Sequence, residues 1–230
     1  MKKNILWIMT VIIIFMVILF WIFSLFYGTP WGKIKFKHDA NEYLKKNYSH
    51  EMVLNSDVIY SFKENTYSVE VSPVELKDIK FGVWQNPNNK NELIDNYFIY
   101  YWTFQVNNEL SKYLDSTFLN DKVSGKIIIQ NSSAYEKNEN TKSAPPNYHE
   151  IKKYLQEGTY IYIDIDKEIN KRNLAEERDL IYKILNVIKK NNYLFNYIFV
   201  EYTKSSDIYF ELDYEEFKQI ENSSDISGYI

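Results

Sequence analysis

The chain has 230 residues, with 27 basic and 31 acidic side chains, a net charge of −4 and no cysteine. This acidic balance lacks the basic stripe that nucleic-acid binding requires, so we expect no nucleic-acid partner. Without cysteine, a lipid-acylated anchor is excluded. Arginine occurs only at Arg172 and Arg178, whereas Lys, Asn, Ile and Tyr are abundant, which is typical of an AT-rich genome and indicates a low-GC bacterium.

Residues 5–27 form an uncharged, strongly apolar run near the start of the chain. At about 1.5 Å per residue the run reaches roughly 34 Å, enough to cross a hydrocarbon core of about 30 Å. A cleaved signal is the alternative, because Lys2 and Lys3 form a short basic start. However, the run is longer than the apolar core of a signal peptide, which has roughly 7–15 residues. In addition, the segment at residues 24–28 lacks the small-x-small pattern that a signal peptidase cleaves. We therefore expect residues 1–32 to be an uncleaved anchor in the lipid bilayer.

Two sequence rules disagree about the side of the membrane that holds residues 33–230. The lysines that follow the span outnumber Lys2 and Lys3, which favours a cytoplasmic domain. The N-terminal tail is short, however, a long domain can be exported regardless of charge, and missing cysteines suit an oxidising surface. We favour a single-pass protein of the cell membrane with an extracytoplasmic domain. The lysines counted after the span are Lys33, Lys35, Lys37, Lys45 and Lys46.

Beyond the anchor, periodicity predicts an α+β protein with two small domains, each a helix on an antiparallel sheet. In the first domain, 33–130, we expect a long aromatic helix to cover a three-strand meander. The expected elements are a helix at 33–48, strands at 53–62, 66–71 and 79–84, a turn at 85–91, the aromatic helix at 93–119 and a strand at 126–130.

The polar stretch 131–147 ends in Pro145-Pro146 and predicts a linker or mobile loop before a second domain, 148–230. In this domain we expect Gly158 to end the first helix in the left-handed conformation. The expected elements are helices at 148–157 and 174–190 and strands at 159–166, 193–202 and 208–212.

The most suggestive candidates for chemistry are Tyr160, Tyr162, Asp164 and Asp166, which alternation places on one strand face. Two carboxylates about 6–7 Å apart could share a cation or act as an acid pair. A solvated face opposite the isoleucines explains the same pattern, and no third ligand stands at loop spacing. We therefore expect no metal, no cofactor and no catalytic residue, and we keep these four as weak binding candidates.

Other chemical signals are weaker. The three histidines, His38, His50 and His149, stand in no ligand spacing, and no phosphate loop or nucleophile motif is present. The rings of 97–104 would suit a carbohydrate or peptide platform, but rings at helical spacing favour core packing.

Six short stretches of the chain carry a family resemblance. They are 28–33 (GTPWGK), 43–48 (YLKKNY), 60–63 (YSFK), 66–69 (TYSV), 163–170 (IDIDKEIN) and 193–198 (YLFNYI). In these stretches the chain resembles the uncharacterised YfjL-like proteins of bacilli and related Firmicutes. That resemblance implies a membrane-anchored, two-domain protein without an assigned activity and supplies no catalytic residue.

Two classes of function follow from the sequence. The first is a binding or interaction module in the bacterial cell envelope that contacts an envelope protein, peptide or polymer. The second is an envelope hydrolase that uses carboxylates such as Asp164 and Asp166. Because no catalytic motif is found, we favour the binding module, which is not an enzyme.

Overall fold

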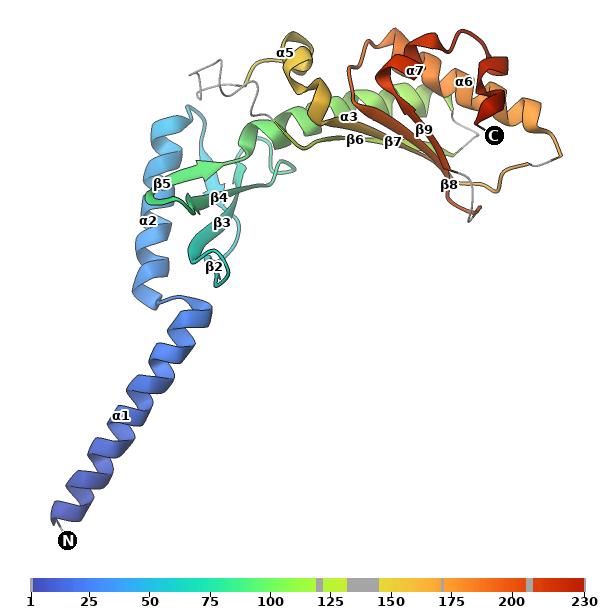
Figure 1. Cartoon of the computed structure of the whole chain (residues 1–230). Coiled ribbons are helices and arrows are strands. Elements are labelled where there is room, and N and C mark those ends of the chain that lie inside the picture. The colour runs from blue at the N-terminus through green and yellow to red at the C-terminus, as the bar shows by residue number, and fades with distance from the viewer. Residues whose placement is uncertain (1, 119–121, 132–144, 171, 206–208, 230) are drawn as a thin grey trace. The chain divides into compact units, whose positions relative to one another are not determined.

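The computed structural model describes residues 2–118, 122–131, 145–170, 172–205 and 209–229. The described chain forms two compact units, the first ending at Tyr97 and the second beginning at Phe98 (Figure 1). Together they mix helices with two sheets rich in antiparallel pairs, as the α+β prediction requires.

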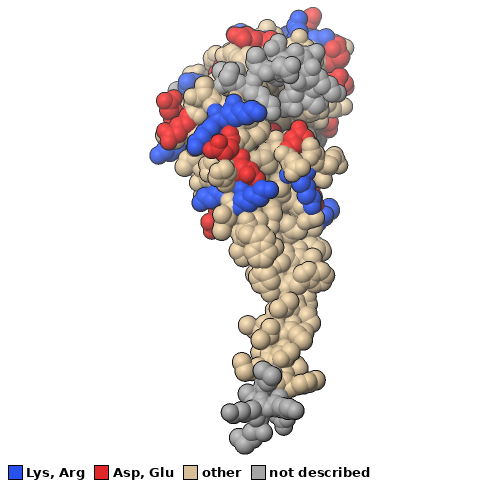
Figure 2. All heavy atoms as spheres, turned by 90° about the vertical axis from the view of Figure 1, so that its left-hand side faces the viewer, with Lys and Arg blue, Asp and Glu red and all other residues tan. Residues whose placement is uncertain are grey.

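The first unit begins with the apolar helix α1 and continues into α2 and a sheet. Helix α1 is long and apolar enough to cross a membrane, and Figure 2 shows no charged side chain on the described part of α1 that faces the viewer. The elements are α1 (Lys2–Tyr27), α2 (Pro30–Asn47), β1 (Met52–Leu54), β2 (Ile59–Ser61), β3 (Thr66–Pro73), β4 (Phe81–Asn86) and β5 (Asn89–Asp95).

A tight elbow joins α1 to α2. Gly28 has a φ of 72°, a conformation that glycine adopts without steric cost. Thr29 then caps α2, because its hydroxyl accepts the Gly32 N–H at 3.0 Å, and Pro30 opens the first turn. Helix α1 therefore ends at Tyr27, which is the last residue of the predicted apolar run.

The first sheet is wholly antiparallel and has the order β1-β3-β4-β5, with β2 also paired to β3. The predicted strand 53–62 is in fact two short strands, β1 and β2, which pair with opposite ends of β3. Strand β5 occupies residues that were expected to form a turn and the start of a helix. Its Asn and Lys side chains are exposed, so little apolar periodicity marked it.

The helix that packs on this sheet is α2, through Phe36, Ala40 and Leu44. The prediction that the aromatic helix of 93–119 covers the meander is wrong. That helix, α3 (Tyr97–Thr117), contributes Trp102 and Leu110 to the core of the second unit. Short apolar patterns identify a buried face but do not identify the sheet that it meets.

The second unit contains a four-stranded sheet of order β6-β7-β8-β9, in which β7 and β8 are parallel and the other pairs antiparallel. Figure 1 shows its helices, coloured green to red. Besides α3, the elements are β6 (Val123–Ile129), α5 (Tyr148–Leu155), η1 (Gln156–Gly158), β7 (Thr159–Ile165), α6 (Leu174–Lys190), β8 (Tyr197–Tyr202), β9 (Tyr209–Asp213), α7 (Tyr214–Gln219) and η2 (Ser223–Gly228).

One core unites this sheet with the buried sides of α3, α5, α6 and α7. Strand β6 approaches α3 closely, since a Cβ at Gly125 would lie 2.7 Å from a Leu114 methyl group. The expected domain 33–130 therefore differs from the observed units, because α3 and β6 pack with residues beyond 145. The expected linker 131–147 lies largely outside the described residues.

One further detail differs from expectation. Gly158 does not end α5 in the left-handed conformation, since α5 passes into η1 and only Gly28 has a positive φ among the described glycines. Glycine is needed there for space, because a Cβ would lie 2.9–3.1 Å from Asn131. By contrast, α6 has the predicted bounds, Leu174–Lys190.

Candidate ligand-binding surface

The second sheet has one face in the core and one face without a helix among the described residues. In β7, Ile161, Ile163 and Ile165 are buried, whereas Tyr160 and Tyr162 are partly exposed and Asp164 is exposed. We call the face that carries Tyr160, Tyr162 and Asp164 the open face. Its other members are Ser124, Lys126 and Ile128 of β6, Tyr197, Phe199 and Glu201 of β8, and Glu211 of β9.

Parallel pairing of β7 with β8 lines up the aromatic residues of the open face. Tyr160 lies beside Tyr197, and Tyr162 lies beside Phe199. The Tyr162 and Phe199 rings stack with centroids 4.9 Å apart and 23° between planes, and Tyr197 continues the stack 6.2 Å from Phe199. Such near-parallel rings form a flat apolar surface with polar hydroxyl tips.

Acidic groups surround these rings. Register places Asp164 beside Glu201 and Glu211 beside Phe199, while Lys126 lies opposite Tyr162. The open face therefore offers three carboxylates and one ammonium group around an aromatic centre.

Asp166 does not join this group. Its carboxylate lies 3.0 Å from the Lys204 ammonium and 3.9 Å from Lys122, and it accepts the Thr203 hydroxyl at 3.2 Å. The hydrogen bond from Lys204 is the main reason that the pKa of Asp166 is lowered. Of the four residues predicted from sequence, the structure brings Tyr160, Tyr162 and Asp164 together on the open face and engages Asp166 with lysines beyond the strand.

The loop after β7 is fixed by a buried carboxylate. Glu177 is only 3% exposed, and it lies 3.0 Å from the Lys167 ammonium. It accepts hydrogen bonds from the Tyr202 hydroxyl at 2.8 Å and the Asn170 N–H at 3.2 Å. Burial and the hydrogen bond to Glu177 raise the pKa of Tyr202. The 163–170 stretch thus has a structural role in holding this loop against α6.

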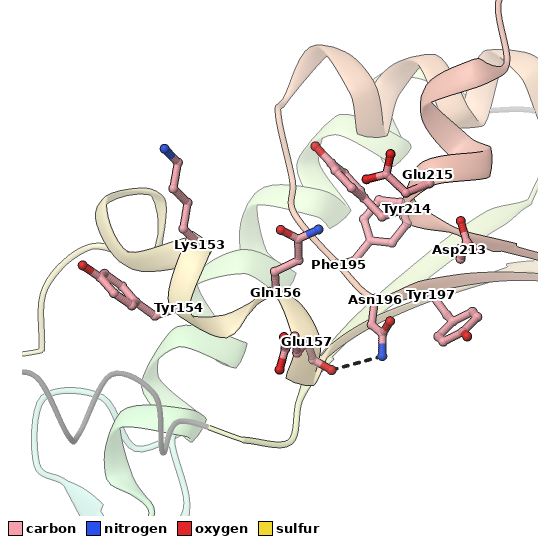
Figure 3. A pocket seen from close by; sticks show the side chains of 10 residues that line it. All are labelled: Lys153, Tyr154, Gln156, Glu157, Phe195, Asn196, Tyr197, Asp213, Tyr214 and Glu215. Atoms are coloured by element: carbon pink, nitrogen blue, oxygen red, sulfur yellow. Dashed lines mark hydrogen bonds between the residues drawn. The ribbon is translucent and has the colours of Figure 1, made fainter.

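An open hollow of about 540 Å³ adjoins the sheet where β8 begins and β9 ends (Figure 3). Phe195 and Tyr214 contribute rings, and the Asn196 amide donates to the Glu157 carbonyl at 3.2 Å. Three acidic residues and one lysine line it. The full lining is Lys153, Tyr154, Gln156, Glu157, Phe195, Asn196, Tyr197, Asp213, Tyr214 and Glu215.

Tyr197 belongs both to this hollow and to the open face. In Figure 3 its ring points away from α7, whereas the Asp213 carboxylate turns toward α7 and caps that helix at 2.8 Å. The hollow and the stacked rings therefore meet at Tyr197. Sequence reasoning missed Tyr197 and Phe199, although their alternation with buried Ile198 and Val200 marks the same face.

Groups for acid–base or metal chemistry are dispersed. His149 lies 2.8 Å from a Glu109 carboxylate oxygen, and His50 lies 2.9 Å from the Tyr97 hydroxyl. Within the described parts of the chain, no three His, Asp or Glu side chains gather as a metal site would require. The open face can stack on apolar surfaces through its rings and accept hydrogen bonds through its carboxylates.

Comparison with protein families gives a match for the first part of the chain. Residues 1–88 match the family model described as YfjL-like, N-terminal domain, which covers α1, α2 and the strands up to β4. No curated protein and no solved structure matches the chain. The first unit is therefore similar to the N-terminal domain of YfjL-like proteins, as the motifs at its start predicted.

Proposed function

We propose that this chain is a membrane-anchored binding module of the bacterial cell envelope, with the open face as its ligand-binding surface. The observation that carries this proposal is the stack of Tyr162, Phe199 and Tyr197, which remains partly exposed beside a complete core. Large aromatic patches left at a surface commonly mark binding sites.

The chemistry of the open face suggests the kind of ligand. Flat rings stack against sugar rings, aliphatic side chains or peptide planes, while Asp164, Glu201 and Glu211 accept hydrogen bonds from hydroxyl or ammonium groups. An envelope peptide, protein or polymer offers such groups. The hollow at Tyr197 extends the surface to a second set of rings and amides.

The apolar α1 supports anchoring to the membrane. Export of both units is supported by the absence of cysteine, which suits an oxidising compartment. The scarcity of arginine and the abundance of Lys, Asn, Ile and Tyr support a low-GC bacterial source such as a member of the Firmicutes.

In-cell photo-cross-linking tests this function. A photoreactive phenylalanine analogue replaces Phe199 on the open face, and the same analogue replaces Lys183 as a control, because Lys183 is exposed on α6. We expect a discrete adduct from position 199 that is absent from position 183. The adduct should be lost when Tyr162→Ser is added, since this change removes the stacking partner of the ring.

Equal cross-linking from both positions, or an adduct that persists with Tyr162→Ser, would contradict a specific site. No adduct from position 199 in growing cells would contradict binding by this face.

A further inference from the structure

Four large apolar side chains of the first unit are exposed close to the elbow. They are 56–72% exposed, whereas the apolar residues of α2 and β3 that face the core are almost completely buried. Trp31 and Ile34 lie in the first two turns of α2, and Ile59 and Phe62 lie on β2 and the turn after it. We call these four residues the collar.

The collar is continuous with α1. The Phe62 ring stacks on Phe26 of α1 with centroids 4.8 Å apart, and the Trp31 ring lies 5.7 Å from Phe20. Figure 1 shows β2 at the end of the first sheet that is next to α1. Two separate segments thus extend the apolar surface of the helix onto the folded unit.

The elbow holds the collar in place. The Thr29 N–H donates to the Tyr67 hydroxyl at 2.9 Å, so β3 is bonded directly to the residue that caps α2. Glycine at position 32 is required for this approach, because a Cβ there would lie 2.2 Å from the Tyr67 hydroxyl oxygen. Since β2 pairs with β3, its position relative to α1 is fixed by the same contact.

Basic side chains accompany the collar. Lys33, Lys35 and Lys37 lie within the first eight residues of α2, before any acidic residue, and Lys63 follows Phe62 in the turn. Lysine side chains bury their aliphatic stems while their ammonium groups contact anionic headgroups. Apolar residues bordered by lysines match the boundary between acyl chains and headgroups.

We propose that the collar lies in the interface of the same bilayer that α1 crosses, so that the turn after β2 is embedded among headgroups. This inference rests on the proposed membrane anchoring. The occupant is the lipid surface, since the collar is continuous with α1 and is bordered by lysines that complement anionic lipids.

Fluorescence quenching of the full-length chain in vesicles tests this placement. The chain has no cysteine, so single cysteines can carry a fluorophore. The reporter is Glu64→Cys, which leaves the collar intact. Asn88→Cys in the turn between β4 and β5 is the exposed control, and Trp21→Cys in α1 reports insertion. Vesicles contain phosphatidylcholine and phosphatidylglycerol with a nitroxide either near the headgroup or deep in the acyl chain.

We expect shallow nitroxides to quench the label at 64 and to leave the label at 88 bright, while deep nitroxides quench the label at 21. Ile59→Thr combined with Phe62→Ser should reduce quenching at 64 to the level found at 88. Because both side chains are exposed, this double change should preserve the fold.

Quenching at 21 without quenching at 64 would overturn the collar and leave the anchor intact. Quenching at 64 that survives the double substitution would also overturn the collar and leave the anchor intact. Absence of quenching at 21 would overturn the anchoring itself, and the collar with it.

Discussion

Replacing Gly32 by alanine probes the contact that joins β3 to the elbow between α1 and α2. A Cβ at this position would lie 2.2 Å from the Tyr67 hydroxyl oxygen and 2.7 Å from the ring carbon that bears it. Tyr67 must therefore move and lose its 2.9 Å hydrogen bond from the Thr29 N–H. We expect Gly32→Ala to loosen β3 as well as the elbow.

The size of the effect follows from three contributions. Displacing a packed side chain costs about 1–3 kcal/mol, and losing the hydrogen bond costs about 1 kcal/mol. Alanine favours helix over glycine by at most about 1 kcal/mol, which offsets part of this cost. The expected net loss is about 1.5 kcal/mol, which corresponds to about tenfold faster amide exchange in β3.

Hydrogen exchange with mass spectrometry of the micelle-held chain measures this effect separately in each unit. Gly228→Ala is the control, because a Cβ at Gly228 meets no atom within 4 Å, and it should leave exchange unchanged. Tyr67→Phe removes the hydroxyl oxygen, so the double variant with Gly32→Ala should cost less than the sum of the single changes. Unchanged or slower exchange of β3 in Gly32→Ala would refute the described contact.

Three further predictions concern the second unit. Asn107→Asp should lower the free energy of unfolding by about 2 kcal/mol in urea titrations, because the amide donates to the Ile127 carbonyl at 2.8 Å and accepts its N–H at 2.7 Å along β6. Asp166→Asn should remove the stabilisation that the Asp166 carboxylate gives the wild-type protein. The wild type has this stabilisation above about pH 4 and loses it as the pH falls through the lowered pKa of Asp166. Melting temperatures measured against pH would record the difference. A fragment of residues 98–230 should fold alone and give dispersed amide NMR signals, since it contains the whole second core.

Matched controls accompany these predictions. Asn108→Asp, one residue along the same helix and exposed, should change unfolding by less than about 0.5 kcal/mol. A fragment of residues 148–230 should not fold, because it lacks β6 and α3. Equal losses of unfolding free energy in Asn107→Asp and Asn108→Asp would contradict the contacts assigned to Asn107. If Asp166→Asn lost melting temperature at low pH as the wild type does, the contacts assigned to Asp166 would be contradicted. A folded 148–230 fragment would contradict the shared core.

Local patterns in the sequence predicted the elements whose packing is simple. The stripe of Ile181, Ile184 and Ile188 predicted α6, and the alternating isoleucines predicted β7. Pairing partners that lie far apart in the chain were not predictable in this way. Helix α3 has a clear apolar stripe, yet nothing local indicates that it packs with β6 and β7 instead of the strands before it.

The candidate surface was predicted in part. Alternation identified Tyr160, Tyr162 and Asp164, and the structure places them together on the open face. Their partners Tyr197 and Phe199 come from a strand beyond α6, and only the parallel register reveals that the rings stack. Asp166 follows the strand and turns to Lys204, which strand periodicity does not predict.

Thiol accessibility in living cells tests most directly whether the open face is exported and occupied. Lys126→Cys lies on the open face opposite Tyr162, and Lys183→Cys lies on the exposed side of α6. With a membrane-impermeant maleimide we predict rapid labelling at 183 in intact cells. At 126 we predict labelling that is slower in cells than in purified protein. Labelling of both positions only after lysis would contradict export, and equal rates at 126 in cells and in purified protein would contradict an occupied face.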